Sequence, residues 1–507
     1  MTGRLYGVGL GPGDPELMTV KAARLIGEAD VIAYHSARHG RSIARSVAEP
    51  YLREGQLEER LVYPVTTETT DHPGGYEGAI ADFYELSAKK LAEHLDAGRD
   101  VVLLCEGDPF FYGSYMYMHE RLAGRFEAEV VPGVTSVSAA ASVLGRPLVQ
   151  RDEVLTVLPG TLPAPELARR LADTEAAAVL KLGRTFGSVR EALAESGKLD
   201  DAWYVERATW GQQRVEPFAD VDPESVPYFS LALLPSPAYR SRVEPAAASP
   251  APAPAPAPAE GGEVVVVGLG PAGPEWLTPE AAAELAAADH IVGYGPYVAR
   301  VPQRAGQQRH ASGNRVEADR AVEALQLAAS GARVAVVSSG DPGVFAMASA
   351  VLEQVSAGNG AGARVRIVPG VTAAQAAASR VGAPLGHDYC VLSLSDRLKP
   401  WEIIERRLDA AGAADLVLAL YNPASRTRVT QLANAREVLL RHRDPATPVV
   451  VARDVGGPEE DIRVTTLGGL DPSTVDMRCL LIVGSSRTVV EEGPDGRSVV
   501  WTPRSYS

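Results

Sequence analysis

The chain has 507 residues, 46% of them hydrophobic and 22% charged, and its formal net charge at pH 7 is −15. This length exceeds what one hydrophobic core normally organises and predicts about three or four domains. The negative charge, with no dense Lys/Arg cluster, argues against a nucleic-acid binder, because such proteins need a basic face. A locally basic cleft for an anionic small substrate remains compatible with it.

Neither a signal-peptide core nor a run of 18 or more apolar residues occurs, so we expect a cytoplasmic protein without a membrane span. The three cysteines, Cys105, Cys390 and Cys479, lie far apart in the sequence. They form no CxxC or Cys/His metal spacing. This usage fits a reducing compartment and predicts no metal site.

Strands and helices are predicted to alternate along the first half. RLYGVGL (4–10) is a short apolar run that predicts a strand leading into a Gly/Pro turn, and Thr19 is placed to cap the helix that follows. DVVLLC (100–105) predicts a buried parallel strand that ends in Gly-Asp-Pro. VPGVT (131–135) opens a helix of small residues. The alternation predicts an α/β fold with glycine loops at the carboxyl ends of the strands, where ligands bind.

An alternating Ala-Pro tract, SPAPAPAPAPA, occupies residues 249–259. Proline fixes φ and biases its neighbour towards extended geometry, so this tract predicts a stiff polyproline-like spacer. We therefore expect a linker over 244–262 between two units, 1–243 and 263–507. Subdomain boundaries are expected near 150 and 386, giving subdomains at about 1–150, 151–243, 263–386 and 387–507.

The two flanks of the linker repeat the same three blocks in the same order. VGLGPGDPELMT (8–19) recurs at 267–278, EGDPFFYG (106–113) recurs as SGDPGVFA at 339–346, and VPGVTSVSAAASVLGRPL (131–148) recurs at 368–385. Such internal similarity indicates duplication or fusion of related enzymes.

GLGPAG (268–273) formally matches the GxGxxG pattern of dinucleotide-binding proteins. The first half departs from that pattern, because Asp14 stands where the third glycine is needed. Pro271 and Pro274 also occupy positions where a dinucleotide helix donates N–H groups to pyrophosphate. A nicotinamide oxidoreductase is therefore kept only as an alternative from a different class.

The combination GxGPGDPxLxT, GDPxxYG and VPGVTSxxAAxxxxGxPL resembles the tetrapyrrole (class III) methylases over both halves apart from the linker. The first half is similar to precorrin-2 C20-methyltransferases. The second, through VSSGDPGVFAMA, GAPLGHDYCVLSLSDRLKPWEIIERRL and VLALYNPASRTR, is similar to precorrin-3B C17-methyltransferases, which also contract the ring. The resemblance implies two tandem units, each with two α/β subdomains around a cleft for S-adenosylmethionine, which is converted to S-adenosylhomocysteine.

Carried over position by position, the resemblance implies a cofactor site in each half, built from the glycine loop, the Gly-Asp-Pro loop, the start of the small-residue helix and the end of a later strand. In the first half these residues are Gly9, Gly11, Pro12, Gly107, Asp108, Thr135, Ser136 and Leu182. In the second half they are Gly268, Gly270, Pro271, Gly340, Asp341, Thr372, Ala373 and Tyr421. Gly13-Asp14 becomes Ala272-Gly273, so any acidic contact of the first loop is absent from the second.

The catalytic candidates are Asp108, Tyr112, Asp341 and His387. Asp108 and Asp341 would face the pyrrole N–H groups of a macrocycle, or would cap the turn that follows. Tyr112 would position substrate or move a proton, although aromatic residues more often serve packing. His387 is the candidate for proton transfer in the second reaction, against a structural role between subdomains.

Arg426 and Arg428 are candidate ligands for substrate carboxylates, or lie in a solvated loop. Expected partners are precorrin substrates, neighbouring enzymes of the cobalamin pathway, and a second copy in a homodimer or the other half in an intramolecular pseudo-dimer. Two further alternatives stay open: the same two steps on cobalt-containing rings, and one half that acts only as a scaffold.

Overall fold

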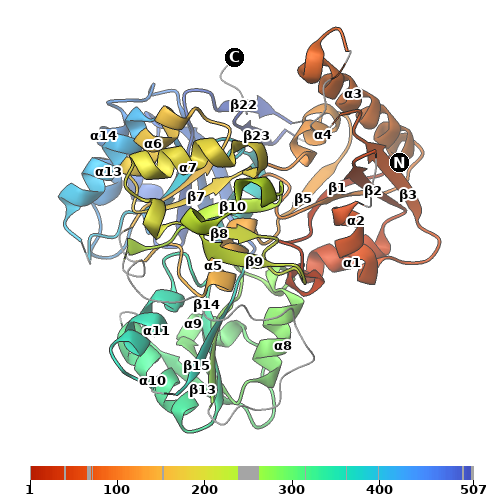
Figure 1. Ribbon diagram of the computed structural model, residues 1–507. Coiled ribbons are helices and arrows are strands. Elements are labelled where there is room, and N and C mark those ends of the chain that lie inside the picture. Colours follow the sequence, from red (N-terminus) through yellow and green to blue (C-terminus); the bar gives the residue numbers. More distant parts are fainter. Residues whose placement is uncertain are drawn as a thin grey trace.

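The computed structural model describes residues 2–38, 42–65, 70, 72–150, 153–237, 262–313, 316–360, 362–397, 399–493 and 496–503. Apart from Gly262, the predicted linker over 244–262 lies outside these residues. The described part is an α/β protein with two five-stranded lobes and one ten-stranded sheet. In Figure 1 the lobe that carries β1 and β2 lies at the right, and the lobe that carries β13–β15 lies at the bottom.

The first lobe is a parallel sheet in the order β3-β2-β4-β1-β5. Its strands are β1 (Leu5–Gly9), β2 (Val31–Ser36), β3 (Leu57–Val62), β4 (Val101–Cys105) and β5 (Ala128–Val131). Its helices are α1 (Val20–Glu28), α2 (Ile43–Ala48), α3 (Gly75–Asp96), α4 (Tyr115–Leu122) and α5 (Ser136–Leu144). β1 and β4 are wholly buried, as their uninterrupted apolar sequences predict for central parallel strands.

The second lobe repeats this topology in the order β13-β12-β14-β11-β15. Its strands are β11 (Glu263–Gly268), β12 (His290–Tyr294), β13 (Gln308–Ser312), β14 (Arg333–Ser338) and β15 (Arg364–Val368). Its helices are α8 (Pro279–Ala287), α9 (Gly295–Arg300), α10 (Glu317–Ala329), α11 (Met347–Ser356) and α12 (Ala373–Val381). Thr19 caps α1 through its side-chain oxygen, which confirms the predicted helix start, and Thr278 caps α8 in the same way.

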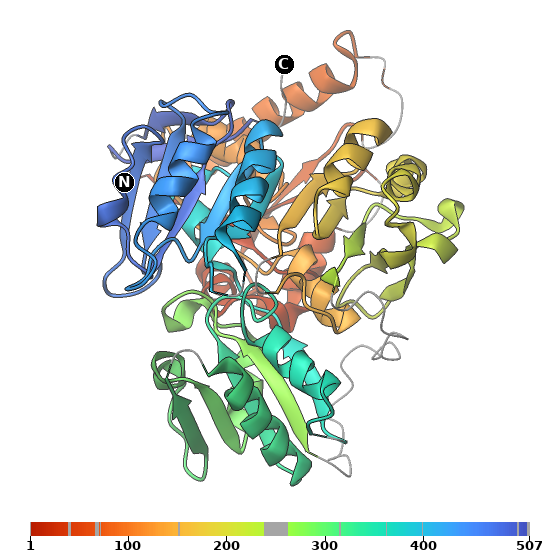
Figure 2. The ribbon, with the colours of Figure 1, turned by 90° about the vertical axis from the view of Figure 1, so that its left-hand side faces the viewer.

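The ten-stranded sheet is made by both halves of the chain. The first half contributes β6 (Leu155–Pro159), β7 (Ala176–Leu180), β8 (Trp203–Glu206), β9 (Arg214–Pro217) and β10 (Ser230–Leu234), with helices α6 (Ala164–Ala172) and α7 (Phe186–Glu195). The second half contributes β17 (Tyr389–Ser393), β18 (Val417–Tyr421), β19 (Pro448–Arg453), β20 (Asp461–Thr466) and β21 (Cys479–Val483), with helices α13 (Trp401–Ala413) and α14 (Gln431–Leu439). Figure 2 shows these two sets of strands next to each other.

The two halves join where β6 pairs with β17 in antiparallel register, with Val157 opposite Tyr389. Two ion pairs cross this seam, Arg170 with Asp388 and Arg407 with Glu175. One hydrophobic cluster also draws residues from α5 and α12 and from both sets of strands. The halves therefore share a core across the seam.

A short sheet of β16 (Gly382–Ala383), β23 (Ser498–Trp501) and β22 (Val489–Glu492) completes the described fold. None of the described helices is both long and apolar enough to cross a membrane. Within the same residues no group of three or more His, Cys, Asp or Glu side chains is placed to hold a metal ion. The three cysteines are free and buried.

Candidate functional site

The glycine loop, the Gly-Asp-Pro loop and the VPG segment meet at the carboxyl edge of the first lobe. Gly11 and Gly107 form an antiparallel bridge, with Gly107 N–H donating to Gly11 O at 2.8 Å. A Cβ on Gly9 would lie 2.6 Å from Gly133 N, and one on Gly133 would lie 2.1 Å from Gly107 O. Glycine is needed at these crossings because the three backbones touch.

The second lobe repeats the crossing. Gly270 bridges to Gly340, a Cβ on Gly268 would lie 2.8 Å from Gly340 O, and one on Gly370 would lie 2.5 Å from the same oxygen. The structure thus brings the first two predicted cofactor loops together in each half. Gly133 and Gly370, the glycines of the two VPG motifs, also lie at these crossings, although they were not among the predicted site residues.

Asp108 ties two of these loops together. One carboxylate oxygen accepts from Phe110 N–H at 3.0 Å, and the other accepts from Gly133 N–H at 3.1 Å. Burial nevertheless dominates and raises the pKa of Asp108 to about 7, while the backbone hydrogen bonds oppose the shift. The side chain of Asp108 therefore caps the turn that follows it, which was one of its two expected roles. It also holds the VPG segment in place.

Asp341 makes the same two contacts in the second half. Its oxygens accept from Gly343 N–H at 2.8 Å and from Gly370 N–H at 3.1 Å. Burial raises its pKa to about 6. A hydrogen bond with Ser138 of the first half lowers that pKa, which places α5 directly beside this loop. A direct catalytic role for Asp108 and Asp341 stays a prediction.

Thr135 and Thr372 begin the small-residue helices. Each is an N-cap whose side-chain oxygen accepts a main-chain N–H, from Ser138 and from Gln375 respectively. Ser136 and Ala373 are the first residues of α5 and α12. These caps direct the helix N-termini towards the loop crossing, where the N–H dipoles favour a negatively charged group such as a carboxylate.

Tyr112 and Lys181 connect the first lobe with the large sheet. The Lys181 Nζ lies 4.8 Å from the centroid of the Tyr112 ring, a cation–π arrangement. Both residues have positive φ, 56° and 61°, and Leu182 follows directly with its side chain buried. Tyr112 and the Leu182 segment therefore face each other across the two subdomains of the first half.

Tyr421 occupies the corresponding region of the second half. Its hydroxyl oxygen accepts from Ala374 N–H at 3.2 Å, and its ring lies 5.4 Å from that of Phe345. The left-handed residue after the strand is Lys181 in the first half and Asn422 in the second. Since Tyr421 directly precedes Asn422, its counterpart along the strand is Leu180, two residues before the predicted Leu182.

His387 and Asp388 lie at the seam between the halves. Asp388 is buried and pairs with Arg170, whereas its Oδ1 is 3.8 Å from His387 Nδ1. Burial lowers the pKa of His387, and the nearby Asp388 carboxylate opposes that shift. The structure thus places the pair beside the first half, and a role for His387 in proton transfer stays a prediction.

Arg426 and Arg428 differ in their surroundings. Arg426 is exposed. Arg428 is partly buried and donates to Ser395 Oγ at 3.2 Å, and burial lowers its pKa. Carboxylate binding by these two residues stays a prediction.

A loop from the large sheet docks on each glycine loop. In the first half Trp210 Nε1 donates to Pro12 O at 2.7 Å, and Asp14 N–H donates to Thr209 Oγ1 at 3.2 Å. In the second half the docking is mainly backbone, with Ala272 N–H donating to Val455 O at 3.0 Å. Trp210 lies almost 200 residues from Pro12, and no local sequence signal indicated this contact.

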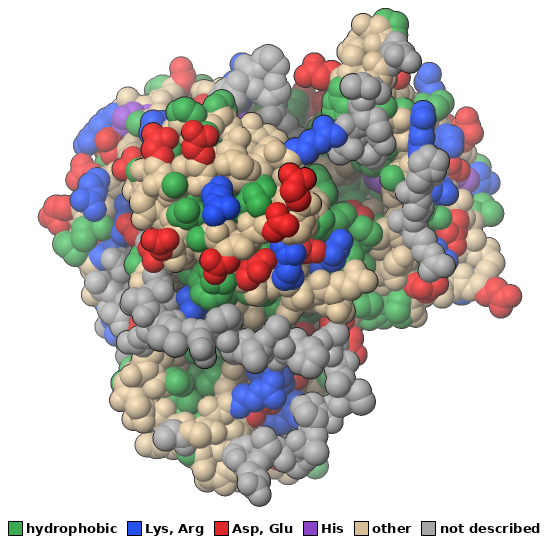
Figure 3. All heavy atoms as spheres, in the orientation of Figure 1, with side chains coloured by type: hydrophobic (Ala, Val, Ile, Leu, Met, Phe, Trp, Pro, Cys, Tyr) green, Lys and Arg blue, Asp and Glu red, His purple; other side chains and the backbone are tan. Residues whose placement is uncertain are grey.

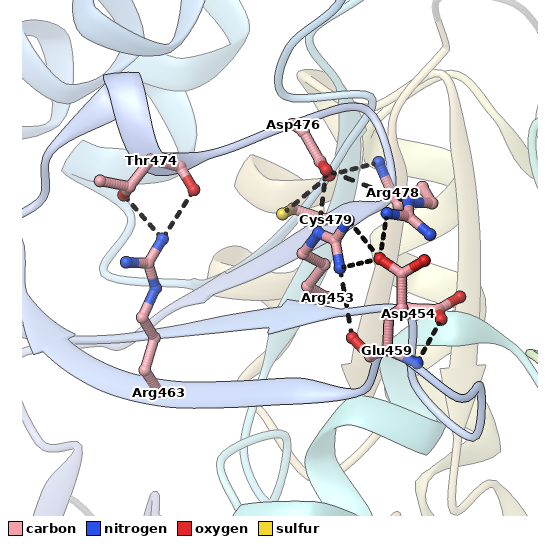
Figure 4. A network of polar contacts seen from close by, with 8 residues as sticks. All are labelled: Arg453, Asp454, Glu459, Arg463, Thr474, Asp476, Arg478 and Cys479. Atoms are coloured by element: carbon pink, nitrogen blue, oxygen red, sulfur yellow. Dashed lines mark hydrogen bonds and ion pairs between the residues drawn. The ribbon is translucent and has the colours of Figure 1, made fainter.

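A polar network holds the second docking loop in shape. Arg453 donates to Asp476 and to Glu459, and Arg478 also donates to Glu459. The carboxylate of Asp454 accepts from Glu459 N–H at 3.1 Å. Figure 4 shows these side chains close together around Arg453 and Asp454, and Val455 directly follows Asp454 in the chain. The network therefore stabilises the segment that covers the second glycine loop.

These sites suit a donor with an adenosyl group and an amino-acid head. Gly107 has positive φ and open space where a side chain would be, and Gly340 meets only ordinary contacts there. The adjoining helices α5 and α12 begin with small residues, which leave room for a ligand. Figure 3 shows the surface hollowed between the first lobe and the large sheet, with hydrophobic side chains along much of the hollow. The residues present fit S-adenosylmethionine.

Fold and site define a fused pair of α/β methyltransferase units. The family model for tetrapyrrole (corrin/porphyrin) methylases matches residues 4–221 and 263–471. The chain belongs to this family. Its glycine loops also lead into short 3-10 turns, and α8 begins only at Pro279. The dinucleotide alternative, which needs the helix to begin at the glycines, therefore finds no support.

Individual relatives match the whole chain or half of it. Cobalamin biosynthesis protein CobIJ of Mycobacterium tuberculosis (strain ATCC 25618 / H37Rv) is 61% identical over 508 residues, covering 99% of this chain and 96% of the relative. A precorrin-2 C(20)-methyltransferase of a Sinorhizobium species is 54% identical over 46% of this chain and 95% of its own length. A precorrin-3B C(17)-methyltransferase of the same source is 48% identical over 48% and 98%. The crystal structure of the methyltransferase CobJ is 49% identical, covers 48% of this chain and all of its own, and has a TM-score of 0.46.

Proposed function

We propose that this chain is a bifunctional S-adenosylmethionine-dependent C-methyltransferase of cobalamin biosynthesis. The first half methylates precorrin-2 at C20, and the second half methylates precorrin-3B at C17 with contraction of the ring. The observation that carries this proposal is the 61% identity to CobIJ over nearly the full length of both chains. The two half-length relatives, a C20- and a C17-methyltransferase, support the assignment of one reaction to each half.

The residues that would hold the donor are those at the loop crossings described above. Pro12, Gly107 and Thr135 would do so in the first half, and Pro271, Gly340 and Thr372 in the second. When bound, S-adenosylmethionine supplies a methyl group already activated by its positively charged sulfur. The chain's own contribution is then to align donor and acceptor and to exclude water, which accounts for much of the rate gain in such transfers.

Mass spectrometry of the products tests the first reaction directly. Purified protein given precorrin-2 and S-adenosylmethionine should add one methyl group at C20 without any oxygenase. An unchanged substrate mass would contradict the assignment. Running the same assay with cobalt-loaded and metal-free rings decides between the two forms of the pathway, and we expect turnover of the metal-free ring.

Calorimetric titration with S-adenosylhomocysteine tests whether both halves are functional. Two equivalents per chain are expected, because both loop crossings are complete. One equivalent would support the alternative in which one half is only a scaffold. The second reaction needs precorrin-3B, which a separate oxygenase must supply, since no haem or iron–sulfur ligand set is evident in the sequence.

We also propose that the two halves pair within one chain and so replace a homodimer. The β6–β17 pairing and the shared core favour this arrangement. The proposed units are 1–243 and 263–507, joined by the 244–262 linker, with subdomains divided near 150 and 386. Light scattering should give the mass of one 53.5 kDa chain. A doubled mass would contradict the proposal.

A further inference from the structure

The Gly-Asp-Pro loops of the two halves differ in the residue that precedes the glycine. Glu106 stands there in the first half and Ser339 in the second. Both follow the central strand of a five-stranded parallel lobe, β4 or β14, at the edge where ligands bind in open α/β sheets. The two reactions therefore have different chemical groups at the same place in the fold.

Glu106 lies at the carboxyl edge of the first lobe, directly after β4. Its side chain is exposed to solvent, yet the surrounding protein desolvates it and raises its pKa. One carboxylate oxygen accepts from Ala44 N–H at 3.2 Å, in the first turn of α2. The carboxylate is thus held at one oxygen and accessible to a ligand.

Aromatic side chains form the wall beside Glu106. The Tyr63 hydroxyl lies 2.7 Å from Ser114 Oγ, at the end of the loop that Glu106 begins, and burial raises the pKa of Tyr63, with a smaller contribution from the charge of Glu106. The Tyr63 ring stacks on His35 with centroids 5.3 Å apart and lies 4.6 Å from the ring of Phe83. Burial lowers the pKa of His35 to about 4, so this histidine is neutral at pH 7. A flat conjugated ring would find an apolar wall here, with one carboxylate at its base.

The second half has the opposite charge at this place. Arg300 Nη1 donates to Ser339 Oγ at 3.1 Å, and Arg300 Nη2 donates to Leu269 O at 2.9 Å. Another guanidinium, that of the buried Arg320, donates to Ser312 Oγ at 2.9 Å at the end of β13, two strands from β14 in the same sheet. The carboxyl edge of the lobe therefore carries a proton acceptor after β4 in the first half and arginine cations near the end of β14 in the second.

We infer that Glu106 is the general base of the first half and removes the proton that C20 loses when it is methylated. This inference rests on the proposed function. C20 is a bridging carbon that carries a hydrogen, so replacing that hydrogen by methyl must release one proton. An electron pair of the conjugated ring would form the C20–CH3 bond while the S–CH3 bond breaks and its electron pair stays on sulfur, which leaves as the neutral thioether of S-adenosylhomocysteine. The C20–H bond of the methylated ring then breaks, its electron pair returns to the ring, and the proton passes to the carboxylate of Glu106. No oxidant or reductant is needed.

The chain supplies its own control, because the second half lacks this carboxylate. In the full-length protein, Glu106→Gln should lower kcat for C20 methylation on the order of 10²-fold or more, the usual contribution of a general base, with little change in KM. The decline of wild-type kcat at low pH should disappear in the variant. Turnover of precorrin-3B and both equivalents of S-adenosylhomocysteine binding should be unchanged.

Two further variants keep the test independent of folding. Glu106→Asp keeps the carboxylate and should recover part of the rate, whereas Glu127→Gln, at an exposed pair with Arg4 on the opposite edge of the lobe, should behave as wild type. Wild-type kcat in Glu106→Gln, an effect on KM alone, or loss of one binding equivalent would each overturn the inference. If the wild-type protein itself does not methylate precorrin-2, the proposed function fails and the inference fails with it.

Discussion

The indole Nε1 of Trp210 donates a 2.7 Å hydrogen bond to the main-chain oxygen of Pro12 and so joins the large sheet to the first glycine loop. In the second half the tryptophan lies beside the glycine loop instead of on the loop that docks from the large sheet. Trp276 follows the glycine loop and lies against Gly456, and its Nε1 has no hydrogen-bond partner among the described residues. The two tryptophans therefore allow a matched comparison.

Trp210→Phe should weaken donor binding in the first half only. Losing one hydrogen bond worth about 0.5–1.5 kcal/mol corresponds to a roughly 2- to 12-fold higher Kd, if the bond acts mainly by holding the loop that binds the donor. Trp276→Phe removes an indole N–H that makes no hydrogen bond to the described residues, and it should leave donor binding at the second site unchanged. Calorimetric titration of each variant with S-adenosylhomocysteine measures both sites, and an equal effect of the two substitutions would contradict this account.

Gly133→Ala should disrupt the first loop crossing. Its new methyl group would lie 2.1 Å from Gly107 O, a backbone atom that cannot turn aside. We expect loss of one binding equivalent and a destabilisation of about 1–3 kcal/mol, as for other overpacked sites. Gly187→Ala is the control, because that glycine is within α7 and has open space around its Cβ position. Full binding by Gly133→Ala would show that the loops can shift apart.

Local signals in the sequence predicted the loops and their helices well. Thr19 and Thr278 could be recognised as caps because an N-cap oxygen bonds an N–H only three residues away. The apolar runs that end in Gly-Asp-Pro likewise needed no distant partner to be identified as buried strands. The α/β fold and the repeated site followed from such short-range patterns.

Contacts between distant segments could not be predicted in this way. Nothing near Trp210 indicates Pro12 as its partner, and nothing in β6 or β17 specifies that these two strands pair with each other. The Glu106–Ser339 difference was visible in the repeated blocks. Its meaning depended on Arg300, which only the fold brings to Ser339.

Asp388→Asn should destabilise the seam between the halves. Asp388 and Arg170 are both buried, and removing one charge of a buried pair typically costs about 3–5 kcal/mol because the other is left uncompensated. Glu166, which also bonds Arg170, should reduce this cost. Glu28→Gln breaks the exposed pair with Arg24 and should cost at most about 1 kcal/mol. Thermal unfolding should therefore show a clearly larger Tm decrease for Asp388→Asn, and equal decreases would contradict a structural role for the pair.

Asp108 should make the protein less stable as pH rises from about 4 to about 7. Burial raises its folded-state pKa to about 7 from an ordinary value of 3.8, so the folded state binds more protons than the unfolded state within this window. The free energy of unfolding then falls with pH, by at most about 4 kcal/mol for a shift of this size, and levels off above pH 7. In Asp108→Asn this contribution is absent, although the amide can accept only one of the two N–H groups that the carboxylate accepts.

The stability difference between wild type and Asp108→Asn isolates this effect, because Asp341 and every other titrating group are common to both chains. Chemical unfolding at fixed ionic strength should show wild type losing part of its advantage between pH 4 and 7. A difference that stays constant, or that grows as pH rises, would mean that the two N–H bonds outweigh burial and keep the carboxylate ionised. In that case the loop crossing would be stabilised by the charge of Asp108.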